Sequence, residues 1–207
     1  MAKQVADPRP SWDEYFMEIA QVVARRSNCS RRSVGAVIAR NHHVLSAGYN
    51  GTPKGVKNCF EGGCPRCAGH AKSGTHLDEC LCTHAEQNAI CQAACYGPSV
   101  DGATIYITIS PCLTCAKLII NAGIKEVVYG GDYAFLETVE KMFTAAGVTY
   151  RKYVEKGLPE APRHAATGPR KASRQVSKEL AKASRPVAER PRKTPRKNLE
   201  KGPSKGD

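Results

Sequence analysis

Two short stretches of this sequence carry side chains that could bind a metal ion and activate water. The first holds His84 and, two residues on, Glu86; the second follows Pro111 and holds Cys112 and Cys115. One imidazole and two thiolates give Zn²⁺ three protein ligands and leave a fourth position open for water. Zinc lowers the pKa of such a water, so hydroxide becomes available near neutral pH. Glu86 could take the water's proton and pass it to a leaving group, so the pattern predicts a catalytic zinc site for hydrolysis.

Each stretch alone also has a purely structural interpretation. Thr83 and Glu86 match a capping box, in which the carboxylate would only accept a hydrogen bond from the Thr83 backbone. A C-x-x-C pair after a strand is also typical of redox proteins. The two stretches together favour the zinc site, because both begin predicted helices and a helix N-terminus stabilises the thiolates of Cys112 and Cys115.

Hydrophobic periodicity and turn residues predict the elements that must position these side chains. In chain order we expect a helix over 11–27, strands over 34–39 and 43–49, a helix over 83–96, a strand over 104–109, a helix from Pro111 to Gly123 with Ser110 as its N-cap, a strand over 126–129, a helix over 133–146 and a strand over 148–154. A tight turn at 40–42 joins the first two strands. Strands that alternate with helices predict a largely parallel sheet covered on both faces, and the initial hairpin makes that sheet mixed.

The stretch over 50–81 is too long for an ordinary connection, so we expect it to be functional or held together by metal. Six cysteines lie in or beside it: Cys29, Cys59, Cys64, Cys67, Cys80 and Cys82. Their C-x-x-C and C-x-C spacings, in a sequence whose N-terminus lacks the apolar stretch of a signal peptide, favour metal binding over disulfides. Buried free thiols are the alternative for some of the six. Cys91 and Cys95, at helical spacing, are predicted to be core thiols.

Positive charge is concentrated at the end of the chain. Residues 158–207 carry 14 basic and 5 acidic side chains, seven of the 13 prolines and no Phe, Trp or Tyr. Such a segment cannot bury enough apolar surface to offset its ordering entropy, so we expect a folded domain over 1–157 and a disordered basic tail over 158–207. The tail could contact nucleic acid non-specifically through counterion release, and a solvated extension is the alternative. Without a run of 18 apolar residues, we expect no membrane span. The absence of a signal peptide and the metal-binding spacing of the cysteines predict a cytoplasmic protein.

The motifs place the chain close to a known family. It resembles the cytidine and deoxycytidylate deaminase superfamily, whose signature is H-x-E followed by P-C-x-x-C, and within it the deoxycytidylate (dCMP) deaminases. The resemblance covers about residues 11–154 and rests on five segments: 29–38 (CSRRSVGAVI), 48–53 (GYNGTP), 84–90 (HAEQNAI), 110–117 (SPCLTCAK) and 122–129 (AGIKEVVY). The Gly-Tyr-Asn-Gly segment and the Ala-Lys pair after the second cysteine are similar to the nucleotide branch rather than the tRNA-adenosine branch.

The resemblance implies an α/β fold with three layers, α/β/α, around a five-stranded mixed sheet. It implies hydrolytic deamination of dCMP to dUMP and ammonia, which supplies dUMP for thymidylate synthesis. His84, Cys112 and Cys115 would hold the catalytic zinc, and Glu86 would be the proton shuttle. Asn50 would contact the sugar of the bound nucleotide, for which an amide that donates and accepts is suited; a simple Asn-Gly turn is the alternative.

The resemblance also implies assembly, regulation and a second metal. Family members are often homohexamers, activated by dCTP and inhibited by dTTP, and Gly48, Tyr49 and Gly51 match the region associated with these effectors. A structural zinc would be held by Cys29, Cys59 and Cys82. Its fourth ligand stays open among Cys64, Cys67, Cys80 and His76, and two extra metals are a further option. For the 5′-phosphate, which needs positive charge or backbone N–H groups, the candidates are Arg26, Lys54 and Lys117.

Two other functions compete with a dCMP deaminase. One is a nucleic-acid deaminase that captures a flipped base in tRNA or single strands and uses the basic tail as an anchor. The other is a catalytically silent, zinc-stabilised binding protein. The sequence favours an enzyme over the silent protein, because Glu86 and all three zinc ligands are present.

Overall fold

The fold is described from a computed structural model of the chain. The structure describes residues 7, 9–69, 72, 75–76, 78–133 and 136–154. The predicted basic tail over 158–207 lies outside the described residues, so its disorder and its role stay predictions. Among the residues described, we find no helix with both the length and the apolar character of a transmembrane segment.

Five strands form one mixed sheet, as predicted. The elements are α1 (Trp12–Ala24), β1 (Gly35–Arg40), β2 (His43–Tyr49), η1 (Cys59–Glu61), α2 (Pro65–Ala68), α3 (Ala85–Tyr96), β3 (Thr104–Ile109), α4 (Leu113–Asn121), β4 (Glu126–Gly131), α5 (Leu136–Ala145) and β5 (Thr149–Lys152). The strand order in the sheet is β2-β1-β3-β4-β5. The β1–β2 hairpin turns at Asn41 and His42, both of which have positive φ, the conformation that a two-residue type I′ turn requires.

The sheet is less parallel than the sequence pattern predicts. β1 runs antiparallel to both of its neighbours, β2 and β3, and only the β3–β4 and β4–β5 pairs are parallel. The prediction missed the β1–β3 pair because strand pairing across a connection of more than fifty residues leaves no local signal. As a result, the carboxyl ends of β3 and β4 meet the amino end of β1, where the Gly35 N–H donates to Thr108 Oγ1 at 3.1 Å.

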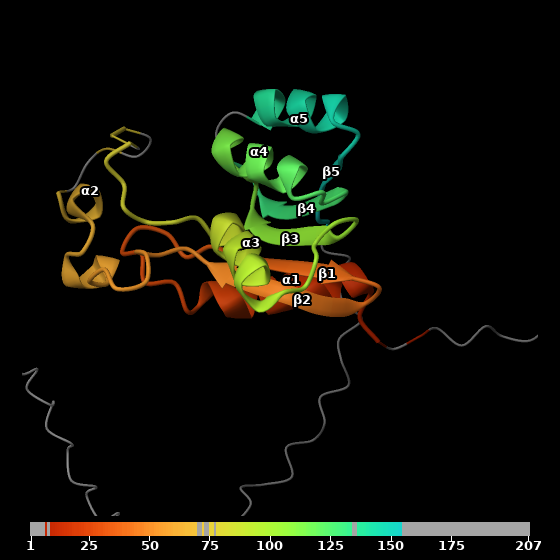
Figure 1. Cartoon of the computed structure of the whole chain (residues 1–207), viewed down its shortest axis with the longest axis horizontal. Helices are drawn as coiled ribbons and strands as arrows, with labels where there is room; N and C mark the ends of the chain where they lie inside the picture. The colour runs from red at the N-terminus through yellow and green to blue at the C-terminus, as the bar shows by residue number, and fades with distance from the viewer. Residues whose placement is uncertain are drawn as a thin grey trace, which may run out of the picture. The chain divides into compact units, whose positions relative to one another are not determined.

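Helices cover both faces of the sheet and make three layers. Figure 1 shows α3 in front of the sheet and α1 partly hidden behind β1 and β2. Successive side chains of the central strands point to opposite faces of the sheet, as in any β-strand. On the α1 face the buried strand residues are Val37, Ala39, Tyr106 and Val128. On the face covered by α3, α4 and α5 they are Ala36, Ile38, Ile105, Ile107 and Val127.

The start of α4 differs from the prediction. The N-cap is Cys112, not Ser110, and the first helical residue is Leu113. Ser110 instead forms hydrogen bonds at the end of the sheet. Its N–H donates to the Gly131 carbonyl, and its Oγ accepts from the Tyr133 N–H at 2.7 Å. The helix therefore begins two residues late, and this delay places Cys112 at the helix N-terminus.

Candidate metal centre and substrate cavity

The N-termini of α3 and α4 come together at the carboxyl edge of β3. His84 is the N-cap of α3 and Cys112 is the N-cap of α4, while Cys115 lies one turn further along α4. His84 Nδ1 is 3.4 Å from Cys112 Sγ and 3.3 Å from Cys115 Sγ. Tetrahedral zinc with Zn–S near 2.3 Å and Zn–N near 2.0 Å holds such donors roughly 3.5 Å apart. These three side chains therefore fit one zinc ion.

Glu86 lies beside these three side chains and is buried, with 3 % of its surface exposed. The capping-box interpretation of Thr83 and Glu86 is wrong, because α3 is capped one residue later. Gln87 fills the capping role: its Oε1 accepts from the His84 N–H at 2.8 Å. Glu86 therefore does not close the capping box of α3, and burial raises the pKa of its carboxyl group.

Protons are unevenly shared among the three donors. The hydrogen bond between the two sulfurs lowers the pKa of the Cys112 thiol to about 4 and raises the pKa of the Cys115 thiol. The hydrogen bond to Cys112 raises the pKa of the His84 imidazole. A metal must displace the protons that remain on such donors, so its binding at this site is pH-dependent. The donor set, one imidazole and two thiols, is one that zinc selects.

A cavity of about 480 Å³ opens beside these side chains. Its lining includes Glu86, Asn50, Tyr133 and the three arginines Arg31, Arg32 and Arg66. The Arg32 guanidinium lies over the Tyr133 ring, 5.1 Å from the ring centroid. The cavity thus joins a buried carboxylate and a metal-ligand set to a wall of positive charge. A cavity of this size is typical of a small-molecule site.

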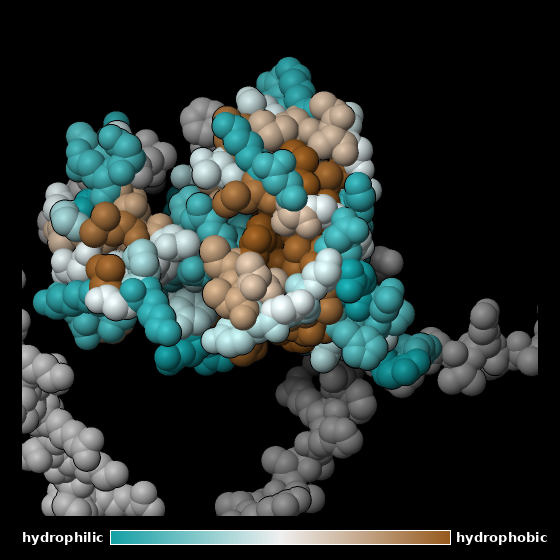
Figure 2. All heavy atoms as spheres, viewed as in Figure 1, coloured by the Kyte–Doolittle hydropathy of each residue, from teal (hydrophilic) through white to brown (hydrophobic). Residues whose placement is uncertain are grey.

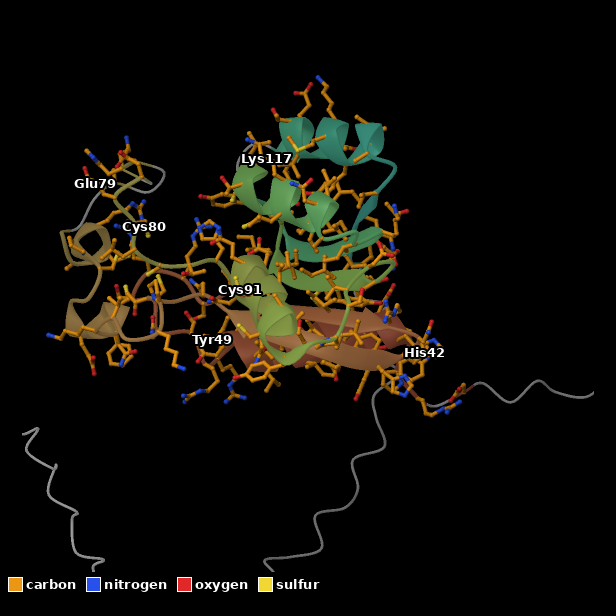
Figure 3. The ribbon with its side chains drawn as sticks, viewed as in Figure 1. His42, Tyr49, Glu79, Cys80, Cys91 and Lys117 are labelled. Carbon is orange, nitrogen blue, oxygen red and sulfur yellow. The ribbon has the colours of Figure 1, made fainter. Side chains whose placement is uncertain are left out.

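The arginines of this cavity were not among the predicted phosphate ligands. Arg26, Lys54 and Lys117 are absent from its lining; Figure 3 labels Lys117 on α4. The sequence did contain a signal, since Arg31 and Arg32 fall inside the segment 29–38 that carries the family resemblance. No local sequence signal, however, showed which basic residues would line the same cavity as Glu86.

Asn50 lines the cavity and holds the loop that carries two of its arginines. Its Nδ2 donates to the Arg32 carbonyl at 2.9 Å, and its Oδ1 accepts from the Val34 N–H at 2.8 Å. The next residue, Gly51, exchanges two backbone hydrogen bonds with Thr83. Asn50 therefore links the arginine loop to the start of α3. Its predicted contact with the substrate sugar stays a prediction.

The three predicted effector residues lie outside the cavity lining. Gly48 packs so closely on α3 that an added Cβ would lie 2.3 Å from both the Ala85 carbonyl oxygen and the Ala89 nitrogen. A Cβ on Gly51 would meet the Asn28 side chain at 2.3 Å. Tyr49 is partly exposed at the end of β2. Close packing explains the need for both glycines, and an effector role for this segment stays a prediction.

The remaining cysteines fall into two groups. Cys29, Cys59, Cys64, Cys67, Cys80 and Cys82 form a cluster of their own, separate from the main core. Cys67 joins the predicted trio Cys29, Cys59 and Cys82 in one four-sulfur group. His76 pairs with Glu79 instead, at 3.2 Å. The prediction for Cys91 and Cys95 is wrong: both are exposed, because α3 buries its opposite side, at Ala85, Glu86, Ala89 and Ala93.

Comparison with known proteins agrees with this geometry. Residues 10–131 match the family model described as the cytidine and deoxycytidylate deaminase zinc-binding region. The deoxycytidylate deaminase of Schizosaccharomyces pombe is 49 % identical over 146 residues, which are 70 % of this chain and 45 % of that protein. The Saccharomyces cerevisiae deoxycytidylate deaminase is 46 % identical over 155 residues, 75 % of this chain and 48 % of that protein. The chain thus spans about half the length of these curated relatives.

A solved structure shares both the fold and the sequence pattern. It is the dCMP deaminase of cyanophage S-TIM5 in complex with dCMP and dUMP, with 34 % identity and a TM-score of 0.59. The match covers 70 % of this chain and 98 % of that one. The resemblance predicted from the motifs is therefore confirmed, and the chain belongs to the cytidine and deoxycytidylate deaminase family.

Proposed function

We propose that this protein deaminates dCMP by hydrolysis, giving dUMP and ammonia. The observation that carries the proposal is the buried Glu86 carboxyl beside the grouped donors of His84, Cys112 and Cys115, on a cavity with three arginines. The carboxylate and donor set suit hydrolysis, and the arginines suit a phosphorylated substrate. The names of the yeast relatives and the dCMP and dUMP bound in the cyanophage structure support the same substrate.

In this proposal each side chain has a defined role. Zinc held by His84, Cys112 and Cys115 supplies the acidified water that hydrolysis needs near neutral pH. Glu86 accepts one proton from the attacking water and delivers it to the ring nitrogen beside C4 as the C4–O bond forms. It then takes the second proton from the new C4 hydroxyl and delivers it to the amine, which leaves as ammonia when the C4–N bond breaks and the C4 carbonyl forms. Burial keeps bulk water from competing for that proton. Asn50 contacts the sugar and keeps the arginine loop in place.

We further propose that Arg31 and Arg32 bind the 5′-phosphate, with Arg66 nearby. Replacing Arg32 with Met should raise the KM for dCMP about tenfold to a hundredfold, since a hydrogen bond to a charged group contributes about 1.5–3 kcal/mol. The kcat should change little, because the phosphate is remote from the reacting carbon. Deoxycytidine, which has no phosphate, should lose no affinity. Initial-rate kinetics with both substrates measures the difference.

Lys54→Met is the matched control for this prediction, because it removes one exposed cation outside the cavity lining. It should leave the KM for dCMP unchanged. An equal loss with dCMP and deoxycytidine in the Arg32 variant would show that the arginine acts on the fold of the site and not on the phosphate.

One assay separates the candidate functions. Purified full-length protein is incubated with dCMP, CMP, cytidine, single-stranded DNA or tRNA, and ammonia release is followed. Turnover of dCMP without turnover of the polymers supports the proposal. Reaction on a polymer alone identifies a nucleic-acid deaminase, and the absence of reaction on every substrate, with zinc bound, identifies a silent binding protein. Either of these results would overturn the proposal.

We also propose a homo-oligomer with dCTP and dTTP as effectors, as the family resemblance implies, in the cytoplasm. Exposed apolar side chains support an assembly surface on the face that carries α3 and α4. Figure 2 shows apolar residues gathered over this face, and Tyr96 and Leu118 are exposed on it. Cys91, which Figure 3 labels on α3, is exposed there as well. At least one structural zinc, in addition to the catalytic ion, belongs to the same proposal.

A further inference from the structure

Six of the eight cysteines outside the catalytic site come from three separate segments. Cys29 precedes β1, Cys59, Cys64 and Cys67 lie in and beside η1 and α2, and Cys80 and Cys82 precede α3. In Figure 1 the segment with η1 and α2 lies beyond the end of the sheet. All six are free thiols. Since this segment contributes no strand to the sheet, it needs another source of stability, and metal ligation is the usual source in such small units.

The sulfurs form two overlapping groups of four. Cys29, Cys59, Cys67 and Cys82 have all their Sγ atoms within 4.8 Å of one another, and so do Cys64, Cys67, Cys80 and Cys82. Cys64 Sγ and Cys80 Sγ are 3.9 Å apart, close to the separation of roughly 3.8 Å expected for two thiolates on one tetrahedral zinc. Each group alone could complete a four-cysteine site, and Cys67 and Cys82 belong to both.

Counting ligands favours two ions over one. A single tetrahedral ion uses four thiolates, which leaves two cysteines of the cluster without a metal. Two tetrahedral ions need eight ligand positions, and six thiolates fill them when two of the six bridge both ions. We propose that the six cysteines hold a binuclear zinc cluster, in which Cys67 and Cys82 bridge, Cys29 and Cys59 complete one site, and Cys64 and Cys80 complete the other.

The surroundings suit such a cluster. Six thiolates and two Zn²⁺ ions leave a net charge of about −2, which a buried site must offset. Arg66 lies between Cys64 and Cys67 in the sequence, is 9 % exposed and carries a permanent positive charge. Near Cys59 Sγ, the Ser30 N–H lies at 3.5 Å and the Ser30 Oγ at 3.6 Å. Hydrogen bonds to sulfur, together with a permanent cation on the same short helix as Cys67, favour ionised thiolates as metal ligands.

The zinc content of purified full-length protein tests the cluster, with elemental analysis and native mass spectrometry as readouts. The wild type should hold three zinc ions per chain. The Cys112→Ser/Cys115→Ser variant, which lacks the catalytic site, should hold two, and both belong to the cluster. Adding Cys64→Ser/Cys80→Ser to that variant should leave one ion, held by the other four cysteines. Cys91→Ser, an exposed cysteine outside both sites, should keep all three.

Cadmium replacement gives a second readout that needs no mutation. The ¹¹³Cd NMR spectrum of the wild type should contain two resonances that are coupled to each other, because two cadmium ions that share a thiolate show scalar coupling through the bridging sulfur. A single cysteine-rich resonance, or a Cys112→Ser/Cys115→Ser variant with one zinc ion, would overturn the proposal. So would iron with inorganic sulfide in place of zinc. None of these readouts depends on turnover, so the cluster and the deaminase proposal can fail separately.

Discussion

Replacing Glu86 with Gln should abolish dCMP turnover while the protein keeps its zinc. The amide has nearly the same shape as the carboxylate, but it cannot accept the proton of the attacking water or return it to the substrate. Because general acid–base catalysis contributes at least about 10²–10⁴ in rate, kcat should fall by that factor or more. His84, Cys112 and Cys115 are unchanged, so the zinc content should equal that of the wild type. Ammonia release and elemental analysis on the same preparation measure the two quantities.

Glu137→Gln is the matched control, since it makes the same chemical change at an exposed carboxylate paired with Lys141 on α5. It should leave kcat unchanged. A Glu86 variant that deaminates dCMP at the wild-type rate would remove Glu86 from the mechanism. A variant that loses zinc together with activity would show that Glu86 is needed to keep the metal and not to move the proton.

Gly48→Ala should destabilise the fold and remove activity together. The added methyl group would lie 2.3 Å from two backbone atoms of α3, Ala85 O and Ala89 N, so the strand and the helix must separate. Overpacking of this kind costs about 1–3 kcal/mol, and more where the neighbour is backbone that cannot rotate away. Because α3 begins at the His84 cap and carries Glu86, the shift also displaces the catalytic groups. Thermal unfolding should show a lower Tm, and kcat for dCMP should fall.

Gly131→Ala is the control for this substitution. There an added Cβ would meet its nearest atoms only at 3.6 and 3.9 Å, which is ordinary contact, and the Tm should stay close to that of the wild type. If Gly48→Ala instead folds normally, keeps its basal kcat and loses only its response to dCTP or dTTP, then this glycine serves effector binding and the packing explanation is wrong.

The sequence predicted those parts of the site that depend on local spacing. His84, Glu86, Cys112 and Cys115 stand out because zinc ligands and a proton carrier follow each other at short, characteristic intervals, and the structure brings these four side chains together. The strands and helices were also predictable, since their burial follows periods of 2 and 3.6 residues. Both signals, motif spacing and burial periodicity, can be read from neighbouring residues without knowing which distant segments contact each other in the fold.

The features that the sequence did not reveal depend on distant contacts. The β1–β3 pairing, the arginines that face the cavity and the exposure of Cys91 and Cys95 are set by packing between segments. The cap positions were missed for a related reason: Ser110 looks like an N-cap, but Tyr133, 23 residues away, takes its hydroxyl. Likewise, the spacing of the cysteines in the sequence does not reveal that Cys67 lies beside Cys29, Cys59 and Cys82. Cys67 reaches this group because it lies on α2, and the position of α2 depends on how the long connection between β2 and α3 folds.

The most direct test of the account is anomalous diffraction from crystals of the purified protein, collected on both sides of the zinc absorption edge. Our expectation is a zinc peak within bonding distance of His84 Nδ1, Cys112 Sγ and Cys115 Sγ, with the Glu86 carboxyl beside it. An anomalous map that shows zinc at other sites of the protein, but no zinc peak among these three donors, would contradict it.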